Sequence, residues 1–240
     1  MSNVSRTIKD LVIANRILAN LGIVDAFGDM SARHPADPGR FFLARPVSPC
    51  FVVPADIIEF GIDGAPLRSD NRGVPKERFI HAAIYEARPE LKAVLHAGPE
   101  DILPFGITPT PLRPVIASVG DMGLRVPVWD IAKRFGAATE VTTLEQGRDL
   151  ARCLGKNRIC LLRGTGFVVT GRTLNDMVRL AAYVPRNGRA IMDATPFGKI
   201  AAISAGEVAA RLAIDPESNA MRRGWEYWAR QAGCGELLAD

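Results

Sequence analysis

The sequence predicts an α/β or α+β fold, a single domain in which helices cover a mixed sheet. Three observations support this prediction. A helical spacing of apolar residues opens the chain, short apolar or alternating segments follow it, and a long helical pattern comes after the last of them. No repeat, low-complexity segment or linker divides residues 1–240, so we expect one domain with a helical tail from about residue 204.

The N-terminal third indicates one helix followed by antiparallel strands. Residues 6–21 carry apolar side chains at helical spacing, and Gly22 is placed to end that helix. Strands are expected at 26–34, 41–45 and 57–60, the last of which leads into an Asp-Gly turn.

Helices and strands alternate in the rest of the chain. Pro75 is expected to open a helix that ends before Pro89, because a proline in the first helical position loses no hydrogen bond. Pro185 lies inside the last long helix and should kink it or end it early, at a cost of about 3 kcal/mol unless tertiary contacts allow it. The remaining strands are expected at 93–96, 126–129, 159–162 and 167–169, and the remaining helices at 143–154 and 173–194.

Composition argues against several classes of protein. The net charge is only +4, and Lys and Arg are scattered singly, so no nucleic-acid partner is indicated. No apolar run approaches the roughly 18 residues of a membrane span, and the N-terminus lacks the apolar region of a signal peptide. The four cysteines show no CxxC spacing and are expected to be reduced and mostly buried. We therefore expect a cytoplasmic protein with no membrane partner.

Familiar cofactor motifs are absent from the sequence. There is no GxGxxG after a strand, no phosphate-binding loop of the GxxxxGK[ST] type and no GxSxG elbow. The segment Gly164-Thr165-Gly166 is too short to be a dinucleotide fingerprint. No nucleotide cofactor is expected.

Three residues remain that could carry chemistry. Glu77 is expected in the first turn of a helix, where the helix dipole favours its ionised form. His96 ends a buried strand, and Thr165 lies between two glycines that let a backbone approach a ligand closely. Each feature alone is more often structural: a solvated glutamate, a satisfied core histidine and a simple turn. Their combination is more specific.

These residues lie in segments that resemble a known family. Residues 28–33 (GDMSAR), 77–89 (ERFIHAAIYEARP), 93–96 (AVLH) and 161–172 (LLRGTGFVVTGR) are similar to the class II aldolase/adducin family, in the right order and spacing. The resemblance runs from about residue 6 to 205. Phe27-Gly28, residues 77–81, 103–105 and 112–115 resemble a decarboxylase-like branch of that family, which includes a pyridine dicarboxylate decarboxylase and aromatic-acid decarboxylases.

The resemblance implies a three-layer αβα fold with a mostly antiparallel central sheet. It also implies a homotetramer with active sites between neighbouring subunits. In the family, a divalent metal held by three histidines stabilises the carbanion left when a C–C bond breaks, and an acidic residue matching Glu77 handles the proton.

The sequence departs from the family at the metal ligands. The family's His-x-His is here His96-Ala97-Gly98, and its third histidine is Thr165. The other two histidines, His34 and His81, do not stand at ligand positions, so no three-histidine site is expected. A rebuilt site of Asp29, Glu77 and His96 remains conceivable, and its oxygen ligands would suit Mg²⁺ or Mn²⁺.

We therefore expect no cofactor, and a small carboxylated substrate, aromatic or an oxo-acid. Asp29 would repel phosphate, which argues against a sugar phosphate. Arg113 and Arg163 could bind a carboxylate in two-point fashion and replace the metal as electron sink, although both also suit surface ion pairs. The expected catalytic residues are Glu77 and His96. The expected substrate-binding residues are Gly28, Asp29, Ser31, Arg113, Arg163 and Thr165.

The first functional hypothesis is a decarboxylase or related C–C lyase that works without the three-histidine metal, with Glu77 or His96 donating a proton. Two alternatives stay open. One is a non-catalytic binding or assembly protein, as adducins are, and the other is a metal-dependent lyase with a remodelled site.

Overall fold

The computed structural model describes residues 2–69 and 71–238, and its strands form one seven-stranded sheet. The strand order is β3-β2-β1-β4-β7-β6-β5, and every neighbouring pair is antiparallel except β5 and β6. The bounds of the strands are Asp29–Arg33 (β1), Arg40–Ala44 (β2), Ile57–Gly61 (β3), Ala93–Ala97 (β4), Val128–Trp129 (β5), Ile159–Leu162 (β6) and Gly166–Gly171 (β7).

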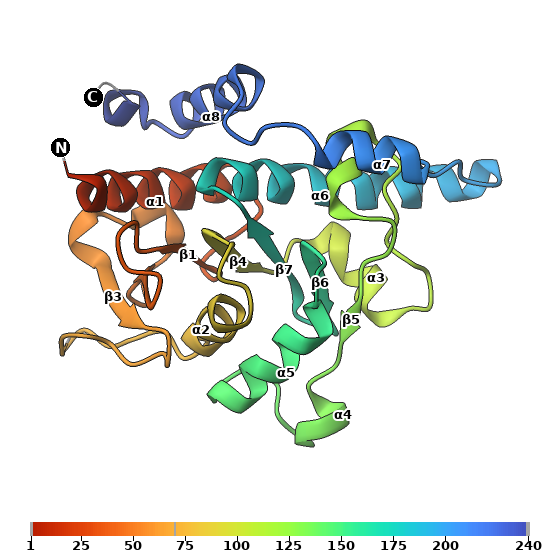
Figure 1. The fold of residues 1–240 in the computed structure, drawn as a ribbon. Helices are drawn as coiled ribbons and strands as arrows, with labels where there is room; N and C mark the ends of the chain where they lie inside the picture. The colour runs from red at the N-terminus through yellow and green to blue at the C-terminus, as the bar shows by residue number, and fades with distance from the viewer. Residues whose placement is uncertain (1, 70, 239–240) are drawn as a thin grey trace.

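Helices cover both faces of this sheet, as Figure 1 shows. On one face α1 (Asn3–Asn20) and α6 (Leu174–Ala194) pack over a large apolar core. On the other face α2 (Arg78–Ala87) and α5 (Leu144–Leu154) enclose a second core. The predicted α/β three-layer fold with a mostly antiparallel sheet is confirmed.

The remaining helices are short or belong to the tail. The loop between β4 and β5 carries α3 (Leu103–Ile107), and α4 (Ala132–Phe135) follows β5. The tail beyond residue 204 is helical as expected, with α7 (Ala205–Leu212) and α8 (Asn219–Gln231), and α8 lies over α1 in Figure 1. No helix in the described part of the chain is long and apolar enough to cross a membrane.

The central strands β4 and β7 are buried along their whole lengths, which explains their nearly continuous apolar sequences. Asp29, the first residue of β1, pairs with His96 near the end of β4, and Ala97 pairs with Phe167 of β7. The start of β1, the end of β4 and the turn before β7 therefore meet at one edge of the sheet. That edge positions the candidate site.

The helix expected to open at Pro75 begins later, at Arg78, so that part of the prediction is wrong. Glu77 is the residue that precedes the first helical turn, with φ −81° and ψ 10°. Its carbonyl oxygen accepts the first hydrogen bond, from the backbone N–H of Ile80 at 2.9 Å. Lys76 and Glu77 form a turn before the helix.

Pro185 does not end the last long helix early, one of the two outcomes expected for it, because α6 continues to Ala194, where the sequence predicts the helix to end. Tertiary contacts hold the second half in place. The side chain of Asn187, which is fully buried, accepts from the backbone N–H groups of Val115 and Ile116 at 2.7 and 3.2 Å and donates to the carbonyl oxygen of Arg113 at 2.8 Å. Burial and these bonds offset the hydrogen bond that Pro185 removes.

Candidate active site

A cavity of about 590 Å³ opens at the sheet edge described above. Four of the residues expected from the sequence line it: Gly28, Glu77, His96 and Thr165. They come from the segment before β1, the residue before α2, the end of β4 and the turn between β6 and β7. The fold thus brings together residues that are up to 137 positions apart in the sequence.

Glu77 and His96 form an ion pair at the wall of the cavity. The Glu77 Oε2 atom lies 3.1 Å from His96 Nδ1, and the backbone N–H of Val141 lies 3.5 Å from Glu77 Oε1. Burial raises the pKa of the Glu77 carboxyl, but the hydrogen bond and positive charge of His96 outweigh it, so the net pKa is lowered. For His96, burial lowers the pKa, and the bond and charge of Glu77 raise it above its usual value. Each group therefore stabilises the charged form of the other.

Asp29 lies beside this pair, as the direct β-ladder partner of His96. Burial raises the pKa of Asp29 to about 6, the charge of His96 opposes this rise, and the charge of Glu77 adds to it. The negative charge of Asp29 in turn helps to raise the pKa of His96. The Asp29 carboxyl therefore takes up and releases a proton near pH 6.

The second ring nitrogen of His96 has no hydrogen-bond partner among the described residues, although it is buried. Because Glu77 holds Nδ1, a protonated His96 ring has its free N–H at Nε2. An unsatisfied buried polar atom is costly, and His96 is one of the residues that line the cavity.

Ser31 was expected to bind substrate, but it lies behind the site. Its side chain is fully buried, and its Oγ bonds to His81 Nδ1 at 2.8 Å and to Tyr85 Oη at 2.9 Å. Burial lowers the pKa of His81 to about 3, so this histidine is neutral and belongs to the core. Ser31 therefore faces the helix α2 that supports the site and not the cavity.

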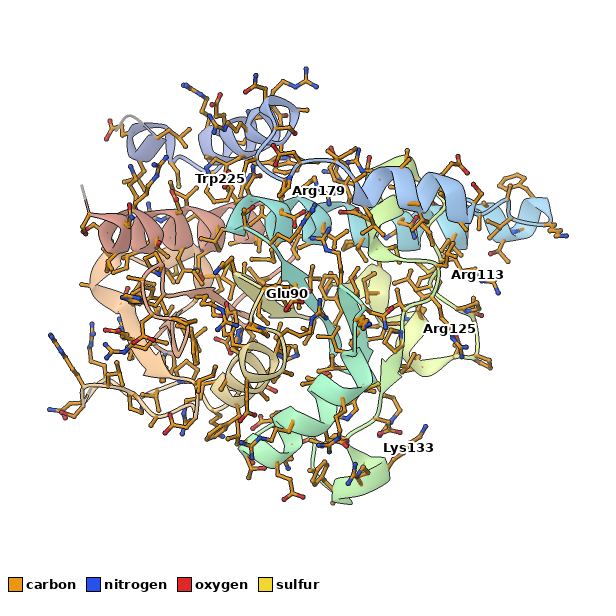
Figure 2. The ribbon with its side chains drawn as sticks, viewed as in Figure 1. Glu90, Arg113, Arg125, Lys133, Arg179 and Trp225 are labelled. Atoms are coloured by element: carbon orange, nitrogen blue, oxygen red, sulfur yellow. The ribbon has the colours of Figure 1, made fainter. Side chains whose placement is uncertain are left out.

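The two arginines expected to bind the substrate are not brought to this cavity within one chain. Arg163 is exposed, and its Nε atom pairs with Asp130 at 2.8 Å. Arg113 lies on the loop between α3 and β5, at the edge of the molecule with Arg125 (Figure 2), and both line a separate, proline-rich hollow. The sequence could not predict that Arg113 lies away from the cavity, because its position depends on how the long loop between β4 and β5 packs.

Two other arginines, which the sequence analysis missed, do line the cavity. Arg186 and Arg189 come from α6, and Arg189 pairs with Asp101 at 2.7 Å. The guanidinium carbon of Arg186 lies 5.1 Å from the ring centre of Tyr183. Both stand on the helix face that also presents Ala182 and Pro185 to the cavity, a spacing of three, four and seven residues. That periodicity was the signal that could have identified them.

The residues present do not fit the family's three-histidine metal. Among the residues that the structure describes, no group of three or more His, Cys, Asp or Glu side chains is arranged to hold a metal ion. A Cβ atom at Gly98 would meet the carbonyl oxygen of Thr165 at 2.7 Å, so a histidine there would have to displace backbone. Gly166 has φ +123°, and a Cβ there would meet Ala97 O at 2.1 Å. Main-chain contacts therefore leave no room for a side chain at Gly98, one of the two positions where the family places a ligand that this chain lacks.

Known proteins similar to this chain include several decarboxylases. The chain is 26% identical over 256 residues to the decarboxylase tropJ of Talaromyces stipitatus, covering 97% of this chain and 96% of that protein. It is 25% identical over 168 residues to a 3,4-dihydroxyphthalate decarboxylase of a Terrabacter species, covering 66% of each.

Solved structures share the fold. An aldolase II superfamily protein from Pseudomonas syringae matches with a TM-score of 0.80 at 20% identity, covering 99% of this chain and 96% of that one. An L-fuculose 1-phosphate aldolase from Glaciozyma antarctica matches with a TM-score of 0.75 at 20% identity, covering 98% and 90%. Residues 9–190 match the family model of the class II aldolase and adducin N-terminal domain. Since that match covers most of the chain, the protein belongs to the class II aldolase and adducin family, on its decarboxylase-like branch.

Proposed function

We propose that this protein is a carbon–carbon lyase that decarboxylates a small aromatic or oxo carboxylic acid, using the Glu77–His96 pair and no three-histidine metal. The observation that supports this most is the pairing itself, with Glu77 Oε2 at 3.1 Å from His96 Nδ1 and Nε2 left without a partner among the described residues. The cavity of about 590 Å³ lies within the usual range for a small-molecule site.

His96 is the proton donor in this proposal. Its protonated ring gives the proton from Nε2 to the substrate carbon that bears the carboxylate. The bond from that carbon to the carboxylate then breaks, its electron pair stays on the carbon skeleton, and CO₂ leaves. His96 regains its proton from solvent, so each cycle consumes one proton and one carboxylate.

In this proposal Glu77 orients the His96 ring and stabilises its protonated form. Its carboxylate accepts a hydrogen bond from Nδ1 of His96, which fixes the ring and stabilises its protonated form. The substrate must accept the electrons during the step. A hydroxylated aromatic ring does so, because protonation at the carboxyl-bearing carbon produces a cation that the hydroxyl oxygen stabilises.

The names of the relatives support this substrate class. 3,4-Dihydroxyphthalate, the substrate in the name of the Terrabacter enzyme, is a hydroxylated aromatic acid with two carboxylates. The cavity of this chain holds Arg186, which has the chemistry to bind a carboxylate in two-point fashion. Asp25 and Glu100 also line the cavity, so the carboxylate must approach from the side of the arginines.

The expected homotetramer with sites between subunits and the cytoplasmic location are part of this proposal. Phe27 lines the cavity and is 81% exposed in the single chain, which agrees with a neighbouring subunit that covers the opening.

Glu77→Gln and His96→Gln test the proposal. Each should lower kcat with hydroxylated benzoates and phthalates by about 10²–10⁴-fold, because the proton donor or its orienting partner is lost. CO₂ release measures the activity, and the circular dichroism spectrum checks that each variant is folded. His34→Gln is the matched control, since His34 lies outside the cavity. Full activity in Glu77→Gln would refute the assignment. No turnover and no ligand-induced thermal shift in the wild type would favour the non-catalytic alternative.

A further inference from the structure

Two of the four cysteines lie in contact, away from the cavity. Cys153 belongs to the last turn of α5 and Cys160 to β6, and their sulfur atoms are 3.9 Å apart. The chain reverses between them at Gly155, whose φ of +54° ends the helix. Cys160 is fully buried, whereas Cys153 is partly exposed. All four thiols are free of disulfide bonds; of the other two, Cys50 is exposed and Cys234 is buried.

The contact makes the two sulfur atoms chemically different. The S–H group of Cys160 donates to the sulfur of Cys153, and this hydrogen bond lowers the pKa of Cys153 to about 7 despite partial burial. The same contact and deeper burial raise the pKa of Cys160. The lowered pKa favours the thiolate of Cys153, the form that reacts with oxidants, and a buried thiol lies beside it.

We propose that Cys153 and Cys160 are a redox modification site, in which a hydroperoxide converts the two thiols into a reversible intramolecular disulfide. The Cys153 thiolate attacks one oxygen of hydrogen peroxide, the O–O bond breaks, and a sulfenic acid and one water form after proton uptake. The Cys160 sulfur then attacks the Cys153 sulfur, the S–O bond breaks, and the hydroxide leaves with the Cys160 proton as a second water. Two thiols lose two electrons, and the peroxide gains them.

The geometry requires only a small movement. The sulfur atoms must approach by about 2 Å to reach disulfide bonding distance, a change that side-chain rotation in a helix end and a strand can share. The bond would join α5 to β6. The α5 helix packs closely on α2, since a Cβ atom at Gly147 would meet the carbonyl oxygen of Phe79 at 2.2 Å. The β6 strand leads into the turn that carries Thr165. The disulfide would therefore connect the elements that support two sides of the cavity.

Thiol titration and peptide mapping test this site. The full chain is treated with a small excess of hydrogen peroxide, desalted and denatured. The free thiols should fall from four to two, the intact mass should drop by about 2 Da, and dithiothreitol should restore both values. Trypsin without reductant should release residues 153–156 linked to residues 159–163.

Two variants serve as controls. Cys50→Ser removes the exposed thiol and should leave the linked peptides unchanged. Cys153→Ser should abolish the link and leave Cys160 reduced, since Cys160 is buried. A Cys153 sulfinic acid with Cys160 still a free thiol, or a disulfide formed between chains through Cys50, would overturn the proposal. The wild-type peptide map alone decides these outcomes, so the test does not depend on how the variants fold.

Discussion

At the scale of single residues, the proposed chemistry depends on Glu77 and His96. The sequence predicted both as candidate site residues, with Glu77 in the first turn of a helix and His96 at the end of a buried strand. The structure places Glu77 just before α2 and His96 one residue before the end of β4. The sequence could not predict their 3.1 Å contact, which the packing of α2 against the sheet creates. It also could not show that Ser31 bonds inward to His81, since a small polar residue in a strand suits either face.

The coupling of Asp29 to His96 predicts a shift in the pH dependence. The folded protein raises the pKa of His96 above its value in the unfolded chain. The protonated ring therefore predominates below the unfolded-state pKa and is lost as the pH rises through the folded-state pKa. The charge of Asp29, whose own pKa is about 6, contributes to that rise. Asp29→Asn should therefore move the basic limb of the kcat/KM profile to lower pH. A histidine NMR titration checks the same shift, and an unchanged or higher His96 pKa would contradict the coupling.

Arg186 is expected to bind the carboxylate that the reaction retains or releases. Arg186→Gln should raise KM for hydroxylated phthalates by about 10- to 150-fold, because a charge-assisted hydrogen bond contributes about 1.5–3 kcal/mol. Arg113→Gln is the matched control and should leave KM unchanged, since Arg113 lines a separate hollow. If the two variants behave the other way round, Arg113 reaches the site from a neighbouring subunit and the assignment of Arg186 is wrong.

At the scale of elements, the strands and long helices follow from their apolar spacing, and the sequence predicted nearly all of them. Two prolines show the limits of local preference. Pro75 precedes its helix by three residues, and Pro185 lies inside α6 without ending it. Local preference places a proline at a helix end, but the contacts of a buried helix face outweigh it, and these contacts are not visible in the sequence.

Asn187 should account for part of that tertiary support. Asn187→Ala removes three side-chain hydrogen bonds to the loop at 113–116 and leaves partly buried backbone groups unpaired. We expect the free energy of unfolding to fall by about 2–3 kcal/mol. Urea denaturation measures it, with Asn20→Ala as the control, because Asn20 is exposed at the end of α1 and its loss should cost less than about 0.5 kcal/mol. Equal losses in the two variants would argue against this role of Asn187.

At the scale of the whole molecule, the family resemblance predicted the three-layer fold with its mostly antiparallel sheet. It did not predict which cations reach the sheet edge that holds the site, because the long loop between β4 and β5 takes Arg113 elsewhere. The tetramer and the single-domain organisation stay predictions. The departures from the family's metal ligands, Gly98 and Thr165, agree with the close main-chain contact between them.

The most direct test of the central claim measures metal content and activity together. The purified protein is treated with a chelator, its metal is quantified by mass spectrometry, and CO₂ release from a panel of hydroxylated aromatic carboxylates is compared before and after treatment. The Glu77–His96 account predicts that turnover persists at well under one metal ion per chain and falls by about 10²–10⁴-fold in Glu77→Gln. Activity that falls with the metal and returns on adding Mg²⁺, Mn²⁺ or Zn²⁺ would contradict it.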